Sequence, residues 1–263
     1  YMVDIMRQQG LLAPIDHSAL KNLGNIDPGI LEKIPDKKME HGIPYATSYG
    51  VLAYRKDLVP NPTASWSMLE RPALLHKTSL LDDMRETLGA ALRSLGHNVN
   101  TRDEAQIAAA GEVVKRWKQN AVKFDNEQYK SAVDSGEFHL VHGYSGDLFQ
   151  VVSENDKVGI LIPEEGVVVA CDELVVPPNA PQMKLAYQFI DFVLDPKVAA
   201  ENMEWMGYLC PNSPGLKLVS KTFLENPAVS ISPEVLKRSE VIHDLGEDRA
   251  KYSKVWDEIK AAR

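Results

Sequence analysis

The chain has 263 residues, of which 44% are hydrophobic and 25% are charged, a composition typical of a soluble globular protein large enough for two lobes. Its formal net charge of −8 excludes a nucleic-acid partner, because the chain offers no basic patch to displace phosphate counterions. The longest apolar runs, such as residues 167–170, are far too short to span a bilayer.

The first residues carry a helical pattern. Apolar side chains at Val3, Ile5 and Met6 predict a helix that ends near Gly10, and a turn-rich segment then runs to residues 41–45. The sequence begins with Tyr1 and shows no signal segment. We therefore expect that an upstream part, with its signal or lipoprotein segment, has been removed.

From residue 49 onwards, short apolar strands alternate with helices. Strands are expected at residues 49–54, 79–81, 138–141, 159–163 and 167–176, the last broken by Asp172 and Glu173. Helices are expected at residues 84–95 and 104–118, after residue 147, from residue 181, at 199–206 and over most of 234–263. This alternation predicts the α/β class with parallel or mixed sheets. No flexible linker divides the chain, so two lobes would have to share strand crossovers.

Asp83 and Glu86 stand where a predicted strand meets a predicted helix. Their spacing is close to that of a capping box, and both acids suit the positive end of the helix dipole. The second interpretation is functional, because ligands of α/β lobes bind at the carboxyl edge of the sheet. The two interpretations are compatible, since a capping carboxylate can also accept a hydrogen bond from a ligand ammonium.

Two further acids interrupt apolar surroundings. Residues 143–147 read Gly-Tyr-Ser-Gly-Asp and predict a strand-to-helix turn, in which Asp147 is either a helix N-cap or an acceptor for a cation. A phosphate site at this turn is disfavoured by the same acid. Asp172 lies within an apolar strand, where an unpaired buried carboxylate is costly, so it is either exposed at an edge or satisfied by a partner.

The search for catalytic and metal-binding motifs finds none. His139 and His142 would lie on opposite faces of a strand, which makes a poor metal pair. Cys171 and Cys210 allow one disulfide or none, and neither has a histidine near it in sequence. The chain also lacks a Gly-x-Ser-x-Gly turn, a Walker motif and a dinucleotide fingerprint. We therefore expect no metal, no cofactor and no enzymatic activity.

Several segments together resemble the spermidine/putrescine-binding proteins of bacterial polyamine ABC transporters. The matching stretches follow the order of that family from end to end, at residues 1–4, 42–45, 63–66, 81–86, 143–147, 162–166, 172–177 and 207–212. The resemblance implies an α/β, two-lobed periplasmic-binding-protein fold of type II, in which each lobe is a mixed sheet flanked by helices and the ligand cleft lies between the lobes. Lobe one would hold residues 1–48 and 171–216, and lobe two residues 49–170 and 217–263.

The resemblance also implies a ligand and its contacts. The ligand would be putrescine, spermidine or both, and the contacts would be Tyr1, Asp83, Glu86, Tyr144, Asp147, Asp172 and Tyr208. The three tyrosines match aromatic positions of the family, Asp147 matches an acid of the putrescine-type branch, and Asp172 matches the central acid. Ala170 and Ile242 depart from the pattern, since spermidine binders of the family have a tryptophan and a glutamine there. The preferred length of the polyamine therefore stays open.

These residue types suit a polyamine, whose ammonium groups need carboxylate acceptors and whose methylene spacers pack on aromatic faces. The resemblance implies a monomeric solute-binding protein that delivers its ligand to a membrane permease, in the periplasm or as a membrane-anchored extracytoplasmic lipoprotein. One alternative keeps the fold and changes the ligand to ferric iron, thiamine or a small anion. Another is an enzyme on a related two-lobed fold, and a sensor in place of the permease is a third.

Overall fold

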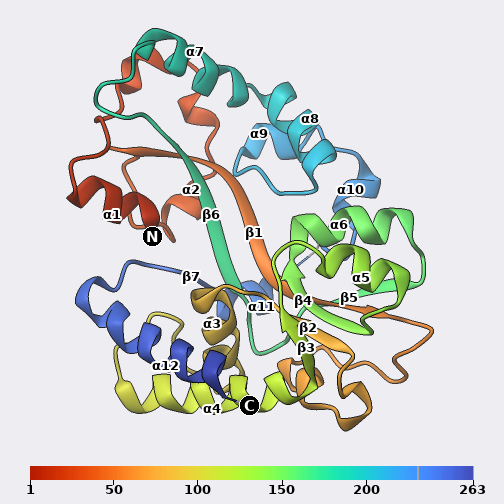
Figure 1. Ribbon diagram of the computed structural model, residues 1–263. Helices are drawn as coiled ribbons and strands as arrows, with labels where there is room; N and C mark the ends of the chain where they lie inside the picture. The colour runs from red at the N-terminus through yellow and green to blue at the C-terminus, as the bar shows by residue number, and fades with distance from the viewer. Residues whose placement is uncertain (230, 263) are drawn as a thin grey trace. The chain divides into compact units, whose positions relative to one another are not determined.

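The computed structural model describes residues 1–229 and 231–262 and divides the chain into two compact units. Unit 1 is Tyr1–Ser48 with Ala170–Glu225, and unit 2 is Tyr49–Val169 with Asn226–Arg263. Strands β1 (Gly42–Arg55) and β6 (Val168–Val175) pass from one unit to the other (Figure 1). The prediction that the two lobes share strand crossovers is therefore confirmed.

The return to unit 2 comes later than expected. Residues 217–225 were assigned to lobe two, but the structure keeps them in unit 1. Helix α10 (Lys221–Glu225) buries Phe223, and the backbone N–H of Ser220 donates a hydrogen bond to Glu204 on helix α8. These local contacts hold the segment to the helix that precedes it, and the expected boundary at residue 216 is wrong.

The sheet of unit 2 is mixed, in agreement with the predicted fold class. Its remaining strands are β2 (Thr78–Leu80), β3 (Ala121–Phe124), β4 (Leu140–Tyr144), β5 (Val158–Leu161) and β7 (Glu240–Val241). Strand β2 runs parallel to β3 and β4, β7 runs parallel to β6, and β1 pairs antiparallel with β4 and β5. Because β2 and β4 are parallel neighbours, their carboxyl ends lie at the same edge of the sheet.

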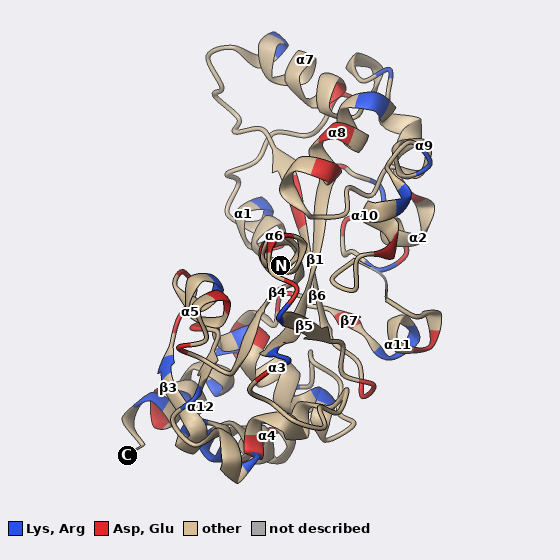
Figure 2. Cartoon of the chain, turned by 90° about the vertical axis from the view of Figure 1, so that its right-hand side faces the viewer, with Lys and Arg blue, Asp and Glu red and all other residues tan. Residues whose placement is uncertain are grey.

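Helices cover this sheet. They are α3 (Met84–Ser94), α4 (Glu104–Asn120), α5 (Tyr129–Ser135), α6 (Ser145–Glu154), α11 (Pro233–Arg238) and α12 (Arg249–Ala261), with 3₁₀ turns at Trp66–Glu70, Pro72–Leu74 and Gly246–Asp248. Buried Leu and Val side chains of α3 and α4 pack with the sheet in one large core, where the rings of Trp66 and Trp117 stack at 6.0 Å. Figure 2 shows basic and acidic residues interspersed along α4 and α12, and Lys251 of α12 forms an ion pair with Glu104 of α4.

Unit 1 has a smaller core. Its helices are α1 (Met2–Gln8), α2 (Pro28–Leu31), α7 (Met183–Val193), α8 (Pro196–Met206), α9 (Ser213–Leu216) and α10, with 3₁₀ turns at His17–Ala19 and Leu23–Asn25. Ile43 of β1 packs in a cluster with Val176, Ile190 and Leu194. Apolar side chains of α7, among them Phe189, point away from that cluster and are exposed.

Helix ends follow the sequence closely. Asp83, Asp103 and Asp195 cap α3, α4 and α8, and in each case the side chain accepts hydrogen bonds from two backbone N–H groups of the first turn. Gly96 and Gly207 follow the ends of α3 and α8 with φ of +75° and +76°, a conformation that other residues adopt at a cost. The helices predicted at 84–95 and 199–206 are confirmed within a few residues.

Two expectations about local structure are wrong. Strand β1 begins at Gly42, inside the segment expected to be turns, because Ile43 is buried and Thr47 forms a bridge with Leu209. Strand β6 continues through Asp172 and Glu173 without a break. The prediction that the tail is mostly helical is confirmed by α11 and α12, although residues 240–241 join the sheet as β7.

Two further features concern cysteines and membranes. Cys171 and Cys210 are both free thiols. Within residues 1–229 and 231–262, no helix is both long and apolar enough to cross a membrane.

Candidate functional site

Asp83 begins helix α3 at the carboxyl edge of the unit 2 sheet. Its Oδ1 accepts hydrogen bonds from the backbone N–H groups of Arg85 (2.8 Å) and Glu86 (3.0 Å), so the predicted N-cap is confirmed. The cap and the helix dipole stabilise the carboxylate form of Asp83, whose side chain is only partly buried. Both cap hydrogen bonds go to Oδ1, so Oδ2 can accept from a ligand.

Glu86 occupies the third position of α3 and is 3% exposed. Its Oε2 is buried and has no hydrogen-bond partner, so this oxygen does not complete a capping box. Burial raises the pKa of Glu86 to about 8, the Asp83 carboxylate adds to the rise, and Arg85 lowers it. Glu86 is therefore mostly protonated at neutral pH unless a cation binds beside it.

A glycine of β1 makes room for Glu86. A Cβ atom at Gly50 would lie 2.9 Å from Oε2 of Glu86 and 3.2 Å from Nε2 of His142. Gly50 pairs with Tyr144 across the β1–β4 ladder, and Leu52 pairs with His142. The sequence analysis missed the roles of Gly50 and His142. The alternation of side chains along β4, which puts His142 and Tyr144 on one face, is the signal that was available.

Tyr144 and Asp147 lie where β4 leads directly into α6. Tyr144 is the last residue of β4, and α6 begins at Ser145, so the predicted turn has no loop. Asp147 lies in the first turn of the helix and is not its N-cap, which corrects one of the two interpretations. Its Oδ2 accepts a 2.6 Å hydrogen bond from the hydroxyl of buried Tyr129 and lies 3.5 Å from Nζ of Lys130. Asp147 is thus engaged with protein partners.

Two of the predicted unit 1 residues lie on β6 and at the start of α1. Asp172 is on the exposed side of strand β6, yet enough protein surrounds it that desolvation raises its pKa. Tyr1 is the N-cap residue of helix α1, its side chain makes no capping hydrogen bond, and it is half-buried.

Glu173 was not predicted as a site residue. Its side chain points to the opposite face of β6 from Asp172, and a Cβ atom at Gly42 would lie 2.3 Å from Oε2 of Glu173. That oxygen is buried and has no hydrogen-bond partner. Burial raises the pKa of Glu173 to about 7, and Asp36 and Asp172 add to the rise.

Tyr208 follows α8 directly after Gly207 and is half-buried. The next residue, Leu209, accepts a 2.7 Å hydrogen bond from the backbone N–H of Thr47 on β1, which ties the Tyr208 segment to that strand. The two positions that depart from the family pattern differ from each other. Ala170 is half-buried at the point where β6 enters unit 1, and Ile242 is 6% exposed in unit 2.

Neither thiol is placed to act as a nucleophile. Burial raises the pKa of Cys171 to about 12, with Glu173 and Asp172 adding to the rise, and burial raises that of Cys210 to about 12. In the part of the chain that the structure describes, no group of three or more His, Cys, Asp and Glu side chains is arranged to hold a metal ion.

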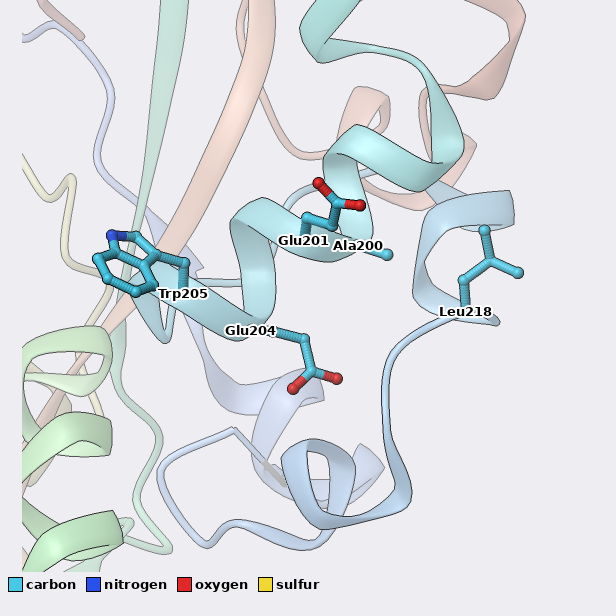
Figure 3. A pocket seen from close by; sticks show the side chains of 5 residues that line it. All are labelled: Ala200, Glu201, Glu204, Trp205 and Leu218. Atoms are coloured by element: carbon cyan, nitrogen blue, oxygen red, sulfur yellow. The ribbon is translucent and has the colours of Figure 1, made fainter.

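A separate surface pocket of about 330 Å³ lies on unit 1, between α8 and the chain that follows α9 (Figure 3). It is lined by Ala200, Glu201, Glu204, Trp205 and Leu218. None of these was predicted as a contact. Figure 3 shows the Trp205 ring and the two carboxylates pointing in different directions, so the pocket does not concentrate charge at one point.

The site chemistry can be stated for each unit by itself. Unit 2 offers the capped carboxylate of Asp83, the buried carboxyl of Glu86 and the ring of Tyr144 near one sheet edge. Unit 1 offers Asp172 on β6, Tyr1 at the start of α1, and Tyr208 directly after α8. Carboxylates with spare acceptor capacity beside aromatic rings favour ammonium ligands over anions.

The sequence matches the family model described as bacterial extracellular solute-binding protein over residues 1–230. It is 32% identical to the spermidine/putrescine-binding periplasmic protein of Escherichia coli, in an alignment that covers 100% of this chain and 76% of that protein. It is 31% identical to the putrescine/cadaverine-binding protein of Pseudomonas aeruginosa, with 98% of this chain and 77% of that protein covered.

The fold is also that of a solved relative. The crystal structure of the Tp0655 (TpPotD) lipoprotein of Treponema pallidum superposes with a TM-score of 0.89 at 32% sequence identity, and it covers 98% of this chain and 81% of that one. The match extends over both units, in agreement with the predicted fold class.

Proposed function

This chain belongs to the bacterial extracellular solute-binding proteins, and we propose that within this family it captures a polyamine such as putrescine or spermidine for an ABC transporter. Two relatives, whose alignments cover 100% and 98% of the chain, are named for spermidine and putrescine and for putrescine and cadaverine. The site residues of both units are of the kinds that hold such a molecule.

One observation carries the proposal. Glu86 is a buried carboxyl group whose Oε2 lacks any hydrogen-bond donor in the protein, three residues from a second carboxylate held by a helix cap. Leaving such a group unsatisfied is costly, and a fold tolerates it where a ligand supplies the partner. An ammonium group supplies a donor and a positive charge at once, and each alkyl spacer of a polyamine then packs on a tyrosine ring.

The ligand is expected to be short. Asp147 already accepts from Tyr129 and lies near Lys130, so it offers less to a third ammonium than Asp83 or Glu86 does. Ala170 and Ile242 provide neither the aromatic ring nor the amide that spermidine binders of the family carry at these positions. We therefore propose that diamines bind at least as tightly as spermidine.

Several finer points belong to the same proposal. The protein acts as a carrier and not as an enzyme, works as a monomer outside the cytoplasm, and hands its ligand to the membrane permease of the transporter. It has no nucleic-acid partner. A lipid anchor is part of the proposal because one solved relative is a lipoprotein. The buried thiols and the acidic acceptor groups favour this carrier role over the enzyme and anion-binding alternatives.

Titration calorimetry and thermal unfolding with putrescine, cadaverine and spermidine test the proposal, with glutamate as an anionic control. We expect affinities of micromolar or better and a rise in melting temperature, because a ligand at one hundred times its Kd stabilises the folded state by about 2.7 kcal/mol. Absence of both heat and stabilisation with all three amines would overturn it, as would a response to glutamate alone.

A further inference from the structure

His142 is a second buried polar group beside Glu86, and the proposed function gives it no task. The side chain is 0% exposed on strand β4, and neither Nδ1 nor Nε2 has a hydrogen-bond partner. Its ring lies edge-on to Trp66, with the ring centroids 5.2 Å apart. Trp66 itself is satisfied, since its indole N–H donates to the carbonyl of Gly166 at 3.0 Å.

The two unsatisfied groups share one place in the fold. Oε2 of Glu86 and Nε2 of His142 lie within 2.9 and 3.2 Å of the same point, the position a Cβ atom would take at Gly50. Only a glycine leaves that space open. Two adjacent buried polar groups, each without a partner, are a costly arrangement that a purely structural core avoids.

The protonation states of the two groups are complementary. Burial lowers the pKa of His142 to about 3, so its ring is neutral at physiological pH and carries one N–H donor and one acceptor nitrogen. Burial also keeps a proton on Glu86 in the absence of ligand. The ring N–H of His142 can stabilise the Glu86 carboxylate by a hydrogen bond once Glu86 has lost its proton.

We propose that His142 is a positioning residue for Glu86, and that its neutral ring donates a hydrogen bond to the Glu86 carboxylate, directly or through one water, when an ammonium ligand binds. The inference rests on the proposed function. In the binding step, Glu86 releases its proton to solvent and keeps both electrons of the O–H bond as the charge that pairs with the ammonium group. His142 keeps its own proton throughout.

The charges around Glu86 fix the sign of the pH effect. Asp83 on the same helix raises its pKa and Arg85 lowers it, while Gly50 of β1 brings no charge and His142 of β4 is neutral. A hydrogen bond to the ionised form lowers the pKa of an acid. Affinity therefore rises with pH up to the pKa of Glu86 and levels off above it, and loss of the His142 donor moves that midpoint upward.

The test is calorimetry of the full chain with putrescine from pH 6 to pH 9, in pairs of buffers with different ionisation enthalpies. Wild-type protein should release close to one proton at pH 7, with a midpoint near that of Glu86. His142→Phe should raise the midpoint by about one pH unit and weaken binding about tenfold at pH 7. His142→Gln keeps an N–H donor, so its pH midpoint and its affinity at pH 7 should both be closer to those of the wild type than the values for His142→Phe. In a Glu86→Gln background, His142→Phe should leave the pH profile unchanged.

A measurement without ligand or variant keeps the inference falsifiable if His142→Phe does not fold. In the ligand-free wild type, nuclear magnetic resonance signals of the His142 ring should shift with the midpoint of the Glu86 carboxyl group. Ring signals that stay flat across that titration would overturn the inference, and so would an unchanged midpoint in a folded His142→Phe protein. Failure of wild-type protein to bind any polyamine overturns the proposed function instead, and the resonance experiment still decides the role of His142.

Discussion

Each unit has a glutamate whose side chain lies against a glycine of β1, buried in the case of Glu86 in unit 2 and half-buried in the case of Glu173 in unit 1. In unit 2, Glu86 belongs to the first turn of helix α3, and its Oε2 lies against Gly50 of β1, where a larger residue would need its Cβ atom. In unit 1, Glu173 belongs to strand β6, and its Oε2 lies against Gly42 at the start of β1 in the same way. Each has an Oε2 without a hydrogen-bond partner.

Burial is the main influence on the pKa of both acids. It raises the pKa of Glu86 to about 8 and that of Glu173 to about 7, and nearby carboxylates add to each rise. Glu86 is the more buried of the two. Each unit therefore holds a carboxyl group that a bound cation would help to ionise.

The largest effect is expected at Glu86 itself. Glu86→Gln removes the charge that pairs with an ammonium group, and hydrogen bonds to charged groups contribute about 1.5–3 kcal/mol. We expect putrescine affinity to fall ten- to hundredfold, measured by calorimetry, with no loss of stability in the absence of ligand. The control is Glu112→Gln on the exposed face of α4, which should bind like wild type. Equal affinities of the two variants would contradict the role of Glu86.

The next effect concerns the space that Gly50 keeps open. Gly50→Ala would place a Cβ atom against Glu86 and His142, and overpacking of a core costs about 1–3 kcal/mol. Urea unfolding should show this loss together with weakened putrescine binding. The matched control is Gly24→Ala, where an added Cβ meets no atom within 4 Å and φ is not positive, and its stability should change by less than about 0.5 kcal/mol. A Gly50→Ala protein as stable as that control would show that the contact relaxes freely.

A third comparison separates the two acids of β6. Asp172 lies on the exposed side of the strand, whereas the side chain of Glu173 lies on the other side, against Gly42. We expect Asp172→Asn to weaken putrescine binding about tenfold, as for loss of one charged hydrogen bond. Glu173→Gln should change affinity much less, because the Glu173 side chain lies against Gly42, on the opposite face of β6 from Asp172. The reverse ranking in calorimetry would make Glu173 the ligand contact of unit 1.

The smallest effect distinguishes capping from binding. Asp83→Ala and Asp103→Ala each remove an N-cap that accepts from two backbone N–H groups, so each should lose about 1 kcal/mol of stability in urea unfolding. Only Asp83→Ala should also weaken putrescine binding, because Asp103, at the start of α4, is not among the predicted contacts. Equal affinities for the two variants would reduce Asp83 to a structural cap.

Much of this architecture could be predicted from the sequence, and the reasons are local. Asp83, Asp103 and Gly96 set the ends of α3 and α4 by chemistry that acts within one helical turn. The carboxylate pair of α3 followed from the same spacing. The α/β class followed from the alternation of strands and helices.

What the sequence did not reveal depends on contacts between distant residues. Glu86, Gly50 and His142 come from three separate segments, α3, β1 and β4, that meet in the folded chain. No local sequence pattern indicates that they lie close together. The same holds for the partners of Asp147, because Tyr129 and Lys130 precede it by a whole strand. The placement of residues 217–225 also failed for this reason, since it depends on the hydrogen bond from Ser220 to α8.

The uneven distribution of tryptophan has a practical consequence. The chain has four tryptophans, and Trp66, Trp117 and Trp256 belong to unit 2, whereas Trp205 belongs to unit 1 and is 85% exposed. An indole in water emits at longer wavelength than a buried one and is open to quenching by iodide. The red edge of the intrinsic fluorescence is therefore a built-in optical label for unit 1, and the blue edge reports on the packed interior of unit 2.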